Sequence, residues 1–205
     1  VVEENTLTDC QNTGRIAGDG AAGILGAAQA TETRFVLTGC ANSGPIVAQA
    51  AGTAQNGTGG ILGRNYFPTG DNLVQGCTNS GPIAPAAGTQ VRYIGGIVGY
   101  CNKPLAIAQC ENTGAVSGAA VGAGGIAGYL DSAQARAEDC VNRGEVSSPS
   151  GSDLGGIVGF NRGALSACAN HGPVSGAARV GGVVGQQPVH APTPFHVLQL
   201  LDELP

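Results

Sequence analysis

Six cysteines recur in the same local sequence. Each is followed at two-residue steps by an asparagine, a glycine and an isoleucine or valine, giving the motif C-x-N-x-G-x-[IV]. The cysteines are Cys10, Cys40, Cys77, Cys110, Cys140 and Cys168, and the asparagines are Asn12, Asn42, Asn79, Asn112, Asn142 and Asn170. A thiol can ligate a metal, form a disulfide or act as a nucleophile, and a side-chain amide can both donate and accept hydrogen bonds.

The spacing of the cysteines is not that of a metal site. No pair forms C-x-x-C, and His171, His190 and His196 complete no recognisable ligand pattern. We therefore predict no metal, no cofactor and no catalytic cysteine. Disulfides between neighbouring copies remain open, but buried free cysteine packs as a small hydrophobic residue, and we favour a column of free thiols. The seventh cysteine, Cys101, lies outside the repeat, and we expect it to be the accessible thiol.

The two-residue step within the motif is the side-chain period of a β-strand. The cysteines recur every 28 to 37 residues, which is typical of a solenoid. A G-I-x-G motif follows each copy, and an apolar column precedes each cysteine by three residues: Leu7, Leu37, Val74, Ile107, Ala137 and Leu165. We predict an all-β parallel β-helix of about six coils with three short strands per coil, one for each of these segments.

Stacked coils place equivalent residues above one another, which predicts two ladders and one stripe. The asparagines should point inward and hydrogen-bond from coil to coil, with the cysteines in a column beside them. If the isoleucine of G-I-x-G faces the core, the next residue should face outward. That second column is Leu25, Leu62, Val98, Ala127, Val158 and Val184. We expect this apolar stripe to be an interface, with self-association through the G-I-x-G face.

The repeat ends before residue 188, and the remaining residues differ in composition. We predict a solenoid domain over residues 1–187 and a capping segment over 188–205, where Thr193 and Pro194 would begin a short leucine-rich helix. Insertions between the motifs fall at 48–60, 64–72 and 85–96. A rigid scaffold with variable loops is a common arrangement for binding, so a specific ligand should contact these corners.

Composition excludes several partners. The chain of 205 residues has a formal net charge of -5 and a single lysine, Lys103, so it has no basic stripe for nucleic acid. No apolar run reaches the roughly 18 residues of a membrane helix, and we expect no membrane insertion in this segment. The first residues, VVEENTLTDC, do not form a signal peptide. We expect a fragment of a larger exported protein, located at the cell surface or outside the cell.

The combined signature CxNxGxV…GGIVG resembles the GLUG-type repeats of large secreted or surface-anchored bacterial proteins. The likeness extends over residues 7–187. The resemblance implies a stalk or adhesive module, and none of the matched positions is a catalytic residue in that family. Uneven coil lengths and the leucine-rich tail depart from the family pattern.

Two functions therefore compete. The first is a non-catalytic adhesin, spacer or assembly unit whose partner is a host or bacterial surface glycan or protein. The alternative is a polysaccharide-active lyase or glycosidase, because parallel β-helices often carry such chemistry. An enzyme of that kind needs carboxylates that converge from neighbouring coils. The best set is Glu111, Glu138 and Asp139, flanked by Arg143.

Overall fold

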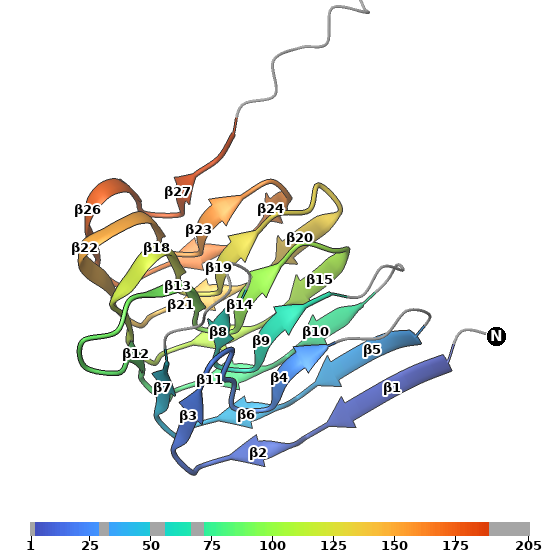
Figure 1. The fold of residues 1–205 in the computed structure, drawn as a ribbon. Coiled ribbons are helices and arrows are strands. Elements are labelled where there is room, and N and C mark those ends of the chain that lie inside the picture. The colour runs from blue at the N-terminus through green and yellow to red at the C-terminus, as the bar shows by residue number, and fades with distance from the viewer. Residues whose placement is uncertain (1–2, 29–32, 50–55, 67–71, 189–205) are drawn as a thin grey trace, which may run out of the picture.

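The computed structural model describes residues 3–28, 33–49, 56–66 and 72–188. All regular secondary structure within these ranges is β-strand, and all strand pairs are parallel. The strands wind into a solenoid of six coils, which Figure 1 shows stacked from the blue N-terminal coil to the red C-terminal coil. The prediction of a parallel β-solenoid of about six turns is confirmed. None of the described residues belongs to a helix long and apolar enough to cross a membrane.

Sheets A and B carry the apolar column and the C-x-N segment. Sheet A contains β1 (Glu3–Thr8), β5 (Thr33–Thr38), β10 (Leu73–Gln75), β15 (Leu105–Ala108), β20 (Ala135–Glu138) and β24 (Ala164–Ser166). Sheet B contains β2 (Gln11–Asn12), β6 (Ala41–Asn42), β11 (Thr78–Asn79), β16 (Glu111–Asn112), β21 (Val141–Asn142) and β25 (Ala169–Asn170). The register pairs equivalent residues of successive coils, such as Val74 with Ile107 and Asn79 with Asn112.

Sheets C and D complete each coil. Sheet C begins with β3 (Ile16–Gly18), β7 (Ile46–Ala48), β12 (Ile83–Pro85) and β17 (Val116–Ser117). The long strand β22 (Val146–Gly155) connects these to β18 (Ala119–Gly124), β13 (Val91–Gly95) and β8 (Thr58–Gly59), and β26 (Val174–Gly181) pairs with β22. Sheet D contains β4 (Leu25–Ala28), β9 (Leu62–Asn65), β14 (Val98–Cys101), β19 (Ala127–Leu130), β23 (Val158–Asn161) and β27 (Val184–Gln186).

The coils are therefore built around four sheets, and the prediction of three strands per coil is wrong. The C-x-N-x-G-x-[IV] motif contributes two strands, because the chain turns at its glycine. A Cβ added at Gly114 would lie within 3.0 Å of the carbonyl oxygen of Gly81 in the coil below, and Gly81 has the same relation to Gly44. Stacked backbones leave no room for a side chain at this corner, which explains the glycine in the second to sixth copies.

The interior consists of two hydrophobic cores. The larger core lies among sheets A, B and D and contains Leu37, Ile107 and the buried cysteines. The smaller core lies between the two halves of sheet C, where Ile83 and Val116 pack with Ile94 and Leu154. Apart from Phe35, the two cores contain only aliphatic and small side chains, which agrees with the chain's lack of Trp and Met.

The predicted outward stripe is buried instead. Leu62, Val98, Ala127 and Val158 are fully buried in the larger core together with Ile61, Ile97, Ile126 and Ile157, and Leu25 packs against that core. The reason is a corner, since the amides of Ile97 and Val98 both donate to the carbonyl of Ile126, each at 2.9 Å. The in–out alternation of side chains is interrupted at this bend, so Ile97 and Val98 both point inward. The predicted self-association required these residues to be exposed, so their burial removes the basis of that prediction.

Candidate functional site

The six motif asparagines form a continuous hydrogen-bonded ladder. From Asn12 to Asn142, each Nδ2 donates to the Oδ1 of the asparagine in the next coil, at 2.7 to 2.8 Å. The same Nδ2 donates to the carbonyl of the motif glycine two residues later, at 2.8 to 2.9 Å. The interior members from Asn42 to Asn142 are almost fully buried. Their amide groups are occupied by one another, so the ladder serves the stacking of the coils.

The first glycine of the G-I-x-G motif packs on this ladder in the first five copies. A Cβ added at Gly60 would lie within 3.0 Å of the Cγ of Asn79, and Gly96 has the same relation to Asn112. The last glycine packs against the second half of sheet C, where a Cβ at Gly128 would lie 2.8 Å from the amide nitrogen of Ile94. The two repeated motifs therefore contact each other, and both glycines are required by close approach of backbone and side chains.

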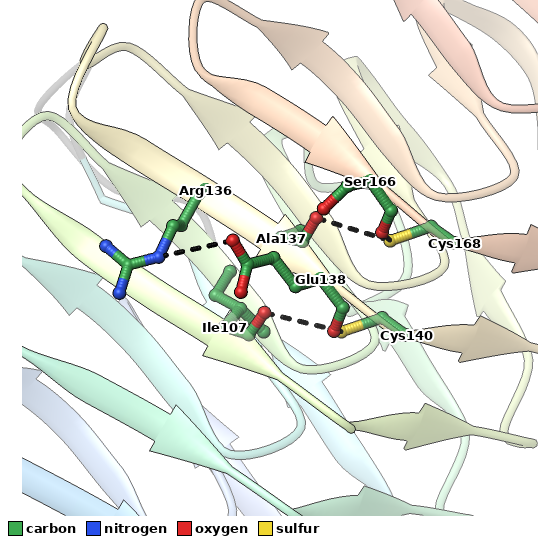
Figure 2. Close-up of polar contacts among 7 residues, drawn as sticks. All are labelled: Ile107, Arg136, Ala137, Glu138, Cys140, Ser166 and Cys168. Carbon is green, nitrogen blue, oxygen red and sulfur yellow. Dashed lines mark hydrogen bonds and ion pairs between the residues drawn. The ribbon is translucent and has the colours of Figure 1, made fainter.

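The six motif cysteines form a second column of free thiols. From the second coil onward, each Sγ donates to a sheet A carbonyl of the preceding coil at 3.4 to 3.6 Å. Figure 2 shows two of these bonds, from Cys140 to Ile107 and from Cys168 to Ala137. Burial raises the pKa of the Cys40 thiol to about 11, so this thiol is protonated at neutral pH.

Cys101 is not the accessible thiol that the sequence led us to expect. Its side chain is fully buried in the larger core, where Sγ lies 2.9 Å from the carbonyl oxygen of Lys103. Burial raises its pKa to about 11. The partly exposed cysteines are Cys10 and Cys168, in the first and the last coil. An end coil has a neighbour on one side only, which leaves its core residues partly open.

Two of the three carboxylates of the alternative, enzymatic function are paired with an arginine. Glu111 on β16 accepts from Arg143 at 2.9 Å, and Glu138 on β20 lies 3.5 Å from Arg136, as Figure 2 shows. Their side chains are nearly half exposed, at 45% and 47%. Asp139 occupies the left-handed corner before Cys140, with φ of 52°. Among the described residues, no group of three or more His, Cys, Asp or Glu side chains could hold a metal ion.

A cluster of aromatic and arginine side chains lies over sheet D and β13. We call it the tyrosine–arginine cluster, and its members are Tyr66, Tyr93, Tyr100, Tyr129, Phe160, Arg64, Arg92 and Arg162. Tyr100, Tyr129 and Phe160 occupy the same register position on β14, β19 and β23. Their rings stack along the rod, with centroids 5.7 and 4.2 Å apart. These rings belong to neither of the two cores, but Tyr100 and Phe160 are buried, at 4% and 7% exposed.

Tyr93 joins the stack from the neighbouring strand β13. Its ring centroid lies 5.2 Å from that of Tyr100 and 4.4 Å from that of Tyr129. Its backbone is left-handed, with φ of 53°, a conformation that costs roughly 1 to 2 kcal/mol for a residue with a side chain. The ring has space because the next coil carries Gly122 beside it, where an added Cβ would lie 3.0 Å from Tyr93 Cδ1.

Three arginines lie on the rings of the cluster. The guanidinium carbon lies 4.7 Å from the Tyr66 centroid for Arg64, 5.2 Å from Tyr93 for Arg92 and 5.8 Å from Phe160 for Arg162. These distances are those of cation–π contacts. Burial raises the pKa of Tyr100 to about 12, and the negative charge of Asp131 acts in the same direction. The Tyr100 hydroxyl is therefore a hydrogen-bond donor at neutral pH.

The sequence analysis missed this cluster, although a signal was present. An aromatic residue directly follows G-I-x-G in three successive coils, as Tyr100, Tyr129 and Phe160. Two of the predicted corners do contribute, because 64–72 contains Arg64 and Tyr66 and 85–96 contains Arg92 and Tyr93. Residues 50–55 and 67–71 of the corners lie outside the described residues, as does the capping segment from residue 189 onward.

Comparison with known proteins gives no relative for this chain. No family model, curated protein sequence or solved structure matches it.

Proposed function

We propose that this chain is a non-catalytic β-solenoid module of a cell-surface or secreted protein, in which a rigid rod spaces and presents an adhesive surface. One observation carries the proposal. The residues repeated in every coil are engaged with one another, because the asparagines, cysteines and glycines fill the ladder, the larger core and the corners. The repeat thus serves stacking, and specific binding is left to side chains that differ between coils. The resemblance to GLUG-type repeats supports the same function.

We also propose that residues 188–205 cover the last coil as a short helix. Support comes from β26 and the turn that follows it, where Val180 and Val183 are 43% and 45% exposed. The equivalent residues one coil earlier, Leu154 and Ile157, are fully buried. A final coil exposes core residues and strand edges unless something covers them.

The experiment is to incubate the purified chain with a panel of surface polysaccharides and mucin. Binding is measured by co-sedimentation, and cleavage by new reducing ends and by the ultraviolet absorbance of unsaturated products. We expect retention of at least one polymer without cleavage. Cleavage that disappears in the double variant Glu111→Gln/Glu138→Gln, and persists in a matched Glu4→Gln variant, would contradict the proposal and establish an enzyme.

A further inference from the structure

The tyrosine–arginine cluster gathers positive charge on an acidic chain. Arg162 is paired with Asp131 at 3.2 Å, and Arg179 on β26 is paired with Asp153. Arg92 is exposed and has no acidic partner within the described ranges. Against a formal net charge of -5 for the whole chain, this guanidinium is available for an anionic ligand.

Arg64, at the other end of the cluster, is also held without a direct carboxylate contact. It donates to the Oδ1 of Asn56, whose Nδ2 in turn donates to Asp19 at 2.6 Å. Arg64 is half-buried and takes the register position that Tyr100 takes in the next coil. The two arginines therefore lie in successive coils at the N-terminal end of the stack, over the rings of Tyr66 and Tyr93.

Three tyrosine hydroxyls of the cluster reach the surface, although the side chains of Tyr93 and Tyr100 are otherwise buried, at 6% and 4% exposed. The hydroxyls of Tyr93, Tyr100 and Tyr129 have no hydrogen-bond partner among the described residues. In the same part of the chain, the one buried side-chain polar atom without a partner is Oδ1 of Asn102, so the three hydroxyl oxygens reach solvent. Unpartnered phenol hydroxyls beside guanidinium groups suit a ligand that carries both hydroxyl and carboxylate groups.

The arrangement favours an extended ligand that runs along the rod. Equivalent side chains of successive coils are separated by the strand spacing of about 4.8 Å, so the cluster offers polar groups at regular steps. A peptide bound as an added strand would need an open sheet edge, but β14 and β19 are paired on both sides. Recognition here uses side chains alone, which suits a polysaccharide.

We infer that the tyrosine–arginine cluster binds an acidic polysaccharide, a chain of uronic-acid units laid along the rod axis. The carboxylates of the sugar pair with Arg92 and Arg64, and its hydroxyls bond to the tyrosine hydroxyls. The inference rests on the proposed adhesive function and names the ligand class of its binding surface.

Intrinsic tyrosine fluorescence can be used to detect binding at this site. All four of its tyrosines, Tyr66, Tyr93, Tyr100 and Tyr129, belong to the cluster, and it has no tryptophan. Tyrosine fluorescence therefore reports ligand binding at the cluster directly. Titration with polygalacturonate should change this fluorescence in a saturable and salt-sensitive way, whereas neutral galactan of matched length should not.

Matched variants locate the binding. Arg92→Gln should weaken the apparent affinity for polygalacturonate about tenfold, the loss expected for one charge-assisted hydrogen bond. Arg15→Gln removes the same charge from an exposed residue between β2 and β3 and should leave the affinity unchanged. Identical circular-dichroism spectra and melting temperatures for the two variants establish that the fold is intact.

Three results would overturn the inference: no fluorescence response to polygalacturonate, equal weakening by both variants, or equally tight binding of poly-glutamate, which would indicate an acidic protein ligand instead. Product analysis in the same samples keeps the two proposals apart. Cleavage of the bound polymer would contradict the non-catalytic function alone, and absence of binding would contradict the ligand class alone.

Discussion

Each interior asparagine acts through three hydrogen bonds that a shorter side chain cannot replace. Asn112 accepts from Asn79 and donates both to Asn142 and to the carbonyl of Gly114, all at 2.8 Å. Its side chain is fully buried. Truncation therefore leaves partners without hydrogen bonds on both sides, whereas Asn12 in the first coil has a single ladder neighbour.

Asn112→Ala should lower the free energy of unfolding by about 3 kcal/mol, because buried groups lose their partners. Asn12→Ala should lower the free energy of unfolding by about 1 kcal/mol, because Asn12 is partly exposed and has a single ladder neighbour. Urea denaturation followed by circular dichroism measures both values. Equal losses at the two positions would show that the ladder is not cooperative along the rod.

The thiols differ in exposure although their local sequence is the same. In the folded chain we expect a thiol reagent to react at Cys10 and Cys168 and to spare Cys101, because only the two end-coil cysteines are partly exposed. Labelling of Cys168 should also rise with pH, since the thiolate is the reacting form and the hydrogen bond with Cys140, together with burial, raises the pKa of Cys168.

The measurement is a colorimetric titration with mapping of the labelled cysteines by mass spectrometry. After denaturation without reductant, all seven cysteines should react. Recovery of one thiol after denaturation would mean that the column is joined in three disulfides, and rapid labelling of Cys101 in the folded chain would contradict its burial.

Among the elements, the corner at G-I-x-G decides which residues face the core. Two consecutive amides donate to one carbonyl there, and the strand of sheet D begins only after this bend. Alternation in the sequence correctly predicted a parallel β-solenoid and the inward asparagines, but not the turn that divides the C-x-N-x-G-x-[IV] motif into two strands. It could not predict this corner, because glycine and aliphatic residues occur both in strands and in tight bends. For this reason the column that includes Val98 was placed outside, although it is buried.

Val98→Lys should unfold the chain or lower its free energy of unfolding by more than about 3 kcal/mol, because the new charge is buried in the larger core without a partner. Ala27→Lys is the matched control. Ala27 is exposed on β4, and the next coil carries Arg64 at the same register position. Thermal melts followed by circular dichroism compare the variants. A stable Val98→Lys variant with wild-type melting would indicate that this column of residues faces solvent.

On the scale of the whole molecule, the recurring motifs predicted the stacking of the coils but not the tyrosine–arginine cluster. Coil number, ladders and the glycine pairs follow from residues that recur in six copies. The tyrosine–arginine cluster comes from Tyr93 on one strand and Tyr100, Tyr129 and Phe160 on others, and only the coil winding brings β13 beside sheet D. The contact between Tyr93 and the rings on sheet D depends on the width of the coil, and the spacing of the sequence motifs does not determine this width.

The two ends of the rod are where stability should be most sensitive to chain length. Deletion of residues 189–205 should lower the melting temperature and cause concentration-dependent association, because Val180 and Val183 remain exposed on the last coil and its strands keep an open edge. Light scattering and thermal melts measure both effects. The full-length double variant Leu200→Ser/Leu201→Ser should reproduce the effect if the tail acts through its apolar side chains. A truncated chain that stays monomeric and melts at the wild-type temperature would show that the last coil needs no cap.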